Sequence, residues 1–143
     1  MRTIGLSAAL AVFGVGALPL LAADQTPLAS LANLATALSE SDSDSALEYF
    51  DSQMKGYGDI ERNIEAMTAQ TDISCSIDIV TDTEENGVHK LDLDWYMQLK
   101  SIGDSAQLER RRTRVQVEMR QAKGKWIITS ISPVSIFDPL RLK

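Results

Sequence analysis

Apolar and polar residues alternate along three segments in the later part of the chain, which is typical of half-buried β-strands. The alternation covers Ile73–Ile79, Leu91–Leu99 and Thr113–Met119. A fourth run, Lys125–Phe137, is denser in apolar residues, and they occur at both parities. We therefore predict an antiparallel meander of four strands in which the register of the last strand stays open.

The segment before these strands follows a helical period instead. Thr26 is suited to an N-cap and Pro27 to the first helical position, and leucines then recur at helical spacing as far as Leu38. The polar stretch Ser39–Ser45 contains no apolar residue and is typical of a loop. These features predict one helix followed by a connector.

Two further helices, the first of them short, are expected after this connector. Ser45 and Glu48 have the spacing of a capping box and predict the start of the second helix. Asp59 is placed to cap a third helix, whose apolar face would carry Ile60, Ile64 and Met67.

The turn between the first two strands decides which side chains share a face. A two-residue turn at Asn86-Gly87 would mix apolar and polar positions across the two strands, which a half-buried sheet does not tolerate. A three-residue loop that pairs Glu84 with Val88 sets Ile79 opposite Leu93 and keeps the apolar face continuous. We therefore predict a three-residue hairpin loop.

This register places opposite charges on the polar face of the sheet. Asp92 and Asp94 lie on one strand, and Arg110, Arg112 and Arg114 lie on the next. Cross-strand pairs of opposite charge stabilise a sheet by about 0.2–1 kcal/mol each. We interpret the arginines as half of a solvent-exposed charged ladder, and we expect Asp94 to lie near Arg112 or Arg114.

Arg111 has the opposite parity and is expected on the apolar face with Trp95 and Met97. A buried charge needs a partner, which Glu109, a backbone carbonyl, an aromatic face or a ligand anion can supply. If the space under the sheet is open, these three residues are the candidate ligand-binding site. If it is filled, they belong to the core, and Arg111 reaches its rim.

The N-terminus has the order of a secretory signal peptide. A single charge, Arg2, precedes the apolar run Ile4–Leu18, which ends at Pro19 and is followed by Ala22 and Ala23. We expect residues 1–23 to be cleaved, 24–143 to form a single domain, and the mature protein to be periplasmic or extracellular without membrane attachment. An uncleaved N-terminal anchor is the alternative.

Composition narrows the candidate chemistry. The formal net charge of -6 argues against binding nucleic acid, which depends on neutralising phosphates. The chain has one histidine, His89, and one cysteine, Cys75, so neither an internal disulfide nor a zinc site is expected. We expect Cys75 to be a small buried residue, and we expect no metal and no cofactor.

Three segments carry a resemblance to a known superfamily: "YFDSQMKGYGDIERNIEAM", "LDLDWYMQL" and "GKWIITSISPVSIFDP". From about Asp24 to Pro139 the chain resembles the NTF2-like superfamily, in particular its small exported bacterial members without assigned activity. The resemblance implies an α+β fold in which N-terminal helices pack on a curved antiparallel meander, the NTF2-like cone. It also implies an apolar pocket in some members and self-association through the open sheet face.

Enzymes of this superfamily place an Asp, His or Tyr in the pocket, and no such residue is matched here. The acids of the central strands and Tyr96 have outward parity, whereas His89 has inward parity but lies at a strand end without an evident orienting partner. We expect His89 to be exposed and inert.

Three functions are therefore considered. The first is a non-catalytic exported domain that binds a small apolar or acidic ligand, or a protein partner on the sheet. The second is a pocket enzyme of isomerase, dehydratase or hydrolase type that uses Arg111 and His89. The third is a structural module, a homodimer formed through the sheet face.

Overall fold

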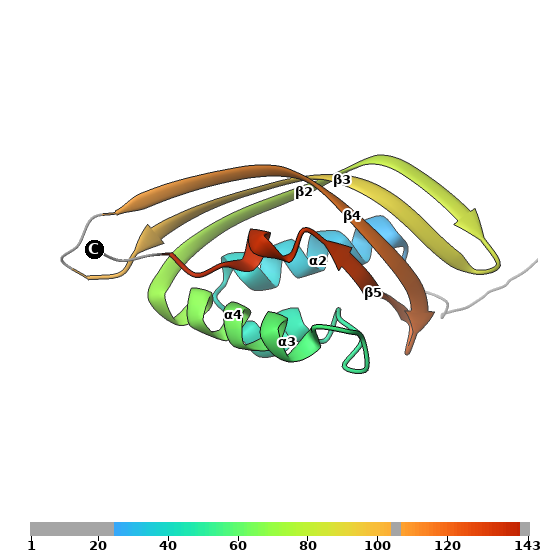
Figure 1. Ribbon diagram of the computed structural model, residues 1–143, viewed down its shortest axis with the longest axis horizontal. Coiled ribbons are helices and arrows are strands. Elements are labelled where there is room, and N and C mark those ends of the chain that lie inside the picture. The colour runs from blue at the N-terminus through green and yellow to red at the C-terminus, as the bar shows by residue number, and fades with distance from the viewer. Residues whose placement is uncertain (1–24, 104–106, 141–143) are drawn as a thin grey trace, which may run out of the picture.

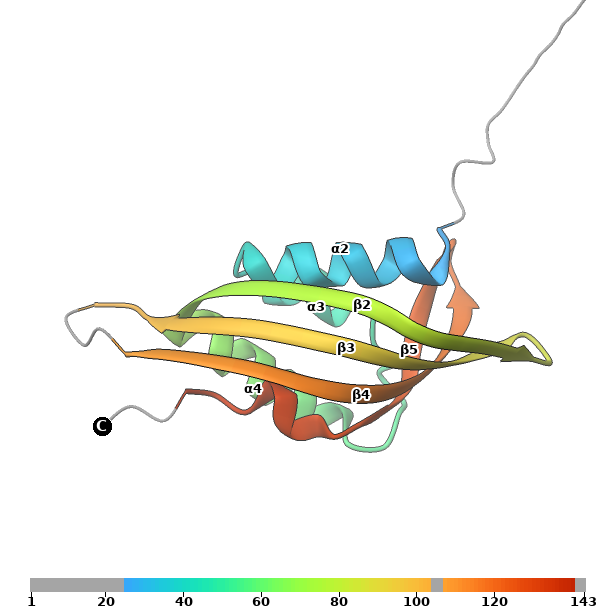
Figure 2. The same ribbon diagram turned by 90° about the horizontal axis from the view of Figure 1, so that it is seen from above.

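The computed structural model describes residues 25–103 and 107–140. In these residues helices precede strands, in the order α2 (Pro27–Ser39), α3 (Ser43–Leu47), α4 (Tyr57–Gln70), β2 (Thr71–Glu85), β3 (Val88–Ser101), β4 (Leu108–Ala122), β5 (Lys125–Ser132) and the short 3-10 helix η3 (Val134–Phe137). The strands form one antiparallel sheet in the order β2-β3-β4-β5. The sheet is arched and the helices lie under its concave side, so the predicted α+β class is confirmed (Figures 1 and 2).

The expected signal peptide, residues 1–23, lies outside the described residues. Among the helices of the described part, none is long and apolar enough to cross a membrane.

Helix α2 begins as the sequence predicts. The Thr26 Oγ1 atom accepts a hydrogen bond from the Ala29 amide at 3.0 Å, and Pro27 is the first helical residue. The cap satisfies one of the amides that a helix N-terminus leaves free. The leucine face of α2 then packs on the sheet, with Leu31, Leu34 and Leu38 fully buried.

The predicted starts of the next two helices are wrong. Helix α3 begins at Ser43, because the Asp42 carboxylate, one turn earlier than expected, accepts from the Ser45 amide at 3.1 Å. Helix α4 begins at Tyr57 after Gly56, whose φ of 83° ends the preceding loop in a left-handed conformation that glycine adopts readily. Asp59 lies in the first turn of α4 and forms an ion pair instead of a cap.

The predicted three-residue loop between β2 and β3 is also wrong. Glu85 pairs with Val88, and Glu84 pairs with His89, which leaves a two-residue turn. Asn86 and Gly87 have φ values of 56° and 80°, the left-handed pair that two-residue hairpins prefer.

A two-residue turn alone would place apolar residues of β2 opposite polar residues of β3. A β-bulge at Val80 removes this mismatch. The register shifts between Ile79 and Thr81, so that Ile79 pairs with Leu93 while Thr81 pairs with Asp92. One extra residue on β2 reverses the parity of every residue beyond it. The expected pairing of the core half of the hairpin is therefore confirmed, although its cause is a bulge within the strand.

A second bulge settles the register of β5. Lys123 and Gly124 form a two-residue turn, and Thr129 is skipped where the pairing with β4 shifts. The skip allows Ile128 and Ile131 to face the core together. Apolar residues at even and at odd positions of β5 can thus both face the core.

Candidate functional site

The concave face of the sheet is filled by side chains. Trp95 and Met97 on β3 are 0% exposed. The Trp95 ring packs edge-to-face on Phe137 of η3 with centroids 5.4 Å apart, and Phe137 packs in the same way on Phe50 at 5.7 Å. Phe50, together with Ile64 and Met67 of α4, belongs to the same buried cluster. Of the two alternatives that the sequence left open, this arrangement matches the filled cone.

Cys75 lies beside Trp95 on this face. Burial raises the pKa of the Cys75 thiol to about 12, while a side-chain hydrogen bond with Trp95 acts in the opposite direction. Trp95 Nε1 has no conventional partner in the described residues, so we regard the sulfur contact as a weak one that leaves the indole largely unsatisfied. At neutral pH the thiol is protonated and therefore a poor nucleophile.

Arg111 lies where its parity predicts. It pairs with Met97 across β3 and β4, and its side chain is 12% exposed. Its Nε donates to Glu109 Oε2 at 2.6 Å, and its Nη1 donates to the Ile136 carbonyl at 2.9 Å. The guanidinium thus has two of the partners that the sequence suggested, and it ties η3 to β4.

A hollow of ≈ 310 Å³ adjoins this arginine. Its lining residues are Glu109, Arg111, Ser135, Asp138 and Pro139. Two carboxylates face one guanidinium that is already paired, so an acidic ligand would meet net negative charge there. The Arg111 guanidinium is therefore not free to bind an anion in this geometry. Ligand binding by Trp95, Met97 and Arg111 stays a prediction.

The structure gives His89 a partner that the sequence did not reveal. Its Nδ1 lies 2.7 Å from Asp82 Oδ1, and its ring packs edge-to-face on Trp126 with centroids 4.6 Å apart. The side chain is 17% exposed, so the expectation of an exposed histidine without a partner is wrong. The Val80 bulge turns Asp82 to the inner face, where it pairs with Leu91.

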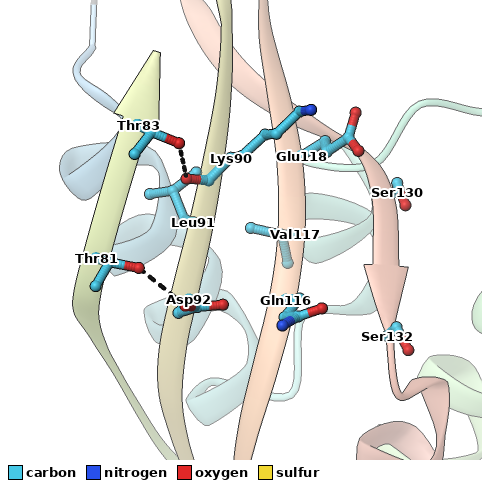
Figure 3. A pocket seen from close by; sticks show the side chains of 10 residues that line it. All are labelled: Thr81, Thr83, Lys90, Leu91, Asp92, Gln116, Val117, Glu118, Ser130 and Ser132. Atoms are coloured by element: carbon cyan, nitrogen blue, oxygen red, sulfur yellow. Dashed lines mark hydrogen bonds between the residues drawn. The ribbon is translucent and has the colours of Figure 1, made fainter. Parts of the chain in front are cut away.

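The convex face of the sheet carries a hollow of ≈ 420 Å³. Two rows of paired residues cross all four strands there: Thr81, Asp92, Gln116 and Ser132, then Thr83, Lys90, Glu118 and Ser130. Figure 3 shows these side chains standing on the four strands, with Thr81 Oγ1 donating to Asp92 Oδ2 at 2.9 Å. Hydroxyls, an amide and charges of both signs line this hollow, together with the apolar side chains of Leu91 and Val117.

The two bulges flank this hollow. Val80 lies on β2 at one edge, and Thr129 lies on β5 at the other. Bulges bend a strand and increase its local twist. The hollow therefore lies where the sheet bends, and only the register of all four strands together could have predicted it.

The arginine ladder continues from the hollow along the same face. Arg112 Nε lies 3.7 Å from Asp94 Oδ1, as expected, and the guanidinium lies 5.3 Å from the centre of the Tyr96 ring. Arg110 Nε donates to Gln98 Oε1 at 3.2 Å. These contacts are exposed, so each contributes little to stability and leaves the cations available to solvent.

A third hollow, of ≈ 390 Å³, lies over α3 and α4, and its lining includes the acids Asp44, Glu48, Glu61 and Glu65 as well as Lys123. Burial and the nearby carboxylates raise the pKa of Tyr57 at its edge. Within residues 25–103 and 107–140 no group of three or more potential metal ligands comes together.

No family model matches the sequence, and no curated protein sequence matches it. Solved structures do match. A candidate scytalone dehydratase from Novosphingobium aromaticivorans aligns over 71% of this chain and 76% of its own, with 8% identity and a TM-score of 0.63. A ketosteroid isomerase-like protein from Erwinia carotovora atroseptica aligns over 73% and 89%, with 9% identity and a TM-score of 0.59.

An NTF2 design aligns over 70% of this chain and 89% of its own, with 16% identity and a TM-score of 0.50. The fold is NTF2-like. The predicted fold is thereby confirmed, while identities of this size carry no activity from the neighbours to this chain. In this NTF2-like domain a filled interior lies beside an outer face that carries a hollow.

Proposed function

We propose that this chain is an exported, non-catalytic NTF2-like domain that binds a protein partner on the convex face of its sheet. One observation carries the proposal: the face that would hold a small substrate is occupied by Trp95 and Phe137, whereas the ≈ 420 Å³ hollow opens on the opposite face. Export is supported by the N-terminal sequence, in which an apolar run is followed by small residues.

The position of the titratable groups favours binding over catalysis. Asp92 and Asp94 point outward, and Arg111 is held by Glu109 and a carbonyl. The His89–Asp82 pair has the geometry of an oriented base, but neither residue lines any of the three hollows described above. A general base needs a substrate within hydrogen-bond reach.

Site-specific crosslinking in intact cells tests the proposal. A photo-crosslinking amino acid would replace Gln116, which lines the convex hollow, and in a matched chain it would replace Arg62, which is exposed on α4. We expect a protein adduct from position 116 and none from position 62. Adducts from position 62 alone, or none from either position, would contradict a partner on the convex face.

A second candidate function, self-association through the same face, is favoured by its charge distribution. The outer face of β2 carries the exposed acids Asp72 and Asp78, and that of β4 carries the exposed arginines. A two-fold interface needs a surface that is complementary to itself, and such a face can meet this need.

Sedimentation of the mature chain tests this second candidate. A dimer that dissociates in Arg114→Asp and re-forms in Arg114→Asp/Asp78→Arg would support it. A monomer at about 100 μM, a concentration at which a specific interface with a Kd in the micromolar range is occupied, would exclude it.

A further inference from the structure

The first half of β4 is an open edge of the sheet. Strand β5 pairs with Gln116–Ala122 only, while β3 pairs with β4 from Leu108 to Arg120. Within residues 25–103 and 107–140, Leu108–Val115 therefore has a strand on one side and none on the other (Figure 2). An unpaired stretch of this kind offers backbone donors and acceptors to an incoming strand.

The register shows which residues present these backbone groups. The Ser101 amide donates to the Gln107 carbonyl at 2.9 Å, which makes this a hydrogen-bonded pair. In an antiparallel ladder such pairs alternate with pairs whose backbone groups face away. Arg111 and Thr113 consequently bond to β3, and the N–H and C=O groups of the even-numbered residues face the open edge.

Three of those even-numbered residues are Arg110, Arg112 and Arg114, whose side chains are exposed on the convex face. In the described part of the chain, none of the three makes a backbone hydrogen bond outside the strand pairing. The same residues thus combine a free backbone edge with a row of cations spaced two residues apart.

We propose that an extended acidic segment of a partner protein adds to the sheet as a strand along Leu108–Val115. Its backbone pairs with Arg110, Arg112 and Arg114, and its acidic side chains, at alternate positions, lie beside the arginines on the convex face. This inference rests on the proposed function, since it names the chemistry of the partner. Main-chain bonds would supply affinity, and the charges would select the partner.

A second copy of this chain fits the edge less well. Pairing of β4 with β4 of another copy would set arginines opposite arginines, which destabilises a sheet. The other sheet edge, on β2, is partly occupied, because the Cys75 amide donates to Ser39 Oγ at 3.0 Å. A head-to-tail pairing of β4 with that edge would also build an open filament rather than a closed assembly.

Amide hydrogen exchange on the mature chain tests the proposal. The probe is a capped peptide of alternating glutamate and valine, matched in length to Leu108–Val115. On binding, exchange of the Arg110, Arg112 and Arg114 amides should slow about tenfold or more, as amides gaining a hydrogen bond do, while the amides of Arg111 and Thr113 stay unchanged. A peptide with lysine in place of glutamate should not bind.

Two further peptides separate strand pairing from simple charge attraction. N-methyl groups are placed on the amides that would face β4 in one peptide, and on the amides that would face away in the other. Only the first should lose binding, by about tenfold, the effect of one or two lost hydrogen bonds. Equal binding of both would reduce the interaction to charge alone and overturn the proposal, as would no binding of the parent peptide.

Variants complete the test. Arg112→Ala should weaken binding of the parent peptide about threefold, the contribution of one cross-strand charge pair, and Arg62→Ala should not change it. Peptide binding without a cellular adduct at position 116 would leave this edge intact and defeat the proposed function. A cellular adduct at position 116 without peptide binding would support the proposed function and overturn strand addition at this edge.

Discussion

The two faces of β3 have opposite surroundings. Trp95 is completely buried against Phe137, whereas Tyr96, the next residue, lies on the convex face under the guanidinium of Arg112. Strand geometry sends adjacent side chains to opposite sides, so one strand serves two purposes. The inner side holds the fold together, and the outer side is where we propose that a partner binds.

The largest expected difference is in stability. Trp95→Ala should lower the free energy of unfolding by about 3–5 kcal/mol, as deletion of a large core side chain does. Tyr96→Ala should lower it by about 1 kcal/mol, since it removes an exposed cation–π contact. Urea unfolding of both variants measures this. Equal losses would break the distinction between the two faces.

Thiol reactivity gives the next contrast. With its pKa raised to about 12, Cys75 should react with a disulfide reagent at pH 8 about a thousandfold more slowly than a cysteine at the neighbouring outward position, made as Ser76→Cys in a Cys75→Ala chain. Because the folded pKa lies above the ordinary value of 9.0, the stabilising contribution of the neutral thiol is complete below pH 9 and is lost as pH rises toward 12. Similar rates for the two thiols would mean that Cys75 is open to solvent.

The arginines on the two faces should differ as well. Arg111→Met removes the bond to the Ile136 carbonyl and should cost about 1–2 kcal/mol, the penalty for leaving a buried acceptor unpaired. Arg112→Met, whose charge is exposed, should cost less than about 0.5 kcal/mol. Thermal unfolding of both variants measures the two losses of stability. A larger loss for Arg112→Met would contradict a structural role for Arg111 and a solvent-exposed role for Arg112.

The smallest effect concerns the ladder itself. Asp94→Asn removes an exposed ion pair with Arg112 and should change stability by no more than about 0.5 kcal/mol. The change should vanish in about 1 M salt, where exposed charges are screened within roughly 3 Å. A salt-independent loss above 1 kcal/mol would make the ladder part of the structural core.

Periodicity predicted the architecture because burial alone determines it. The helical spacing of leucines before Ser39 and the alternation around Trp95 each bury one face, and the order of elements follows from them. The parity of Arg111 was predictable for the same reason. The starts of α3 and α4 were not predictable, because Asp42, Ser45 and Asp59 are all capable caps and the choice among them depends on how the chain enters each helix.

The bulges lay beyond what one sequence can predict. Val80 and Thr129 are ordinary strand residues, and no local signal marks either as the extra residue. Their consequences reach well beyond the strands themselves: one bulge turns Asp82 toward His89, and together they flank the convex hollow. The one hint was Asn86-Gly87, a strong two-residue turn signal that conflicts with the apolar register unless a strand contains a bulge.

Native mass spectrometry of the protein, purified gently from its own compartment, separates a partner on the convex face from a ligand inside the cone. We expect a chain free of small molecules that carries a protein partner, which is retained in Arg62→Glu and lost in Arg112→Glu. A small-molecule adduct that persists in Arg112→Glu and disappears in Trp95→Leu would place the function inside the cone and contradict the account.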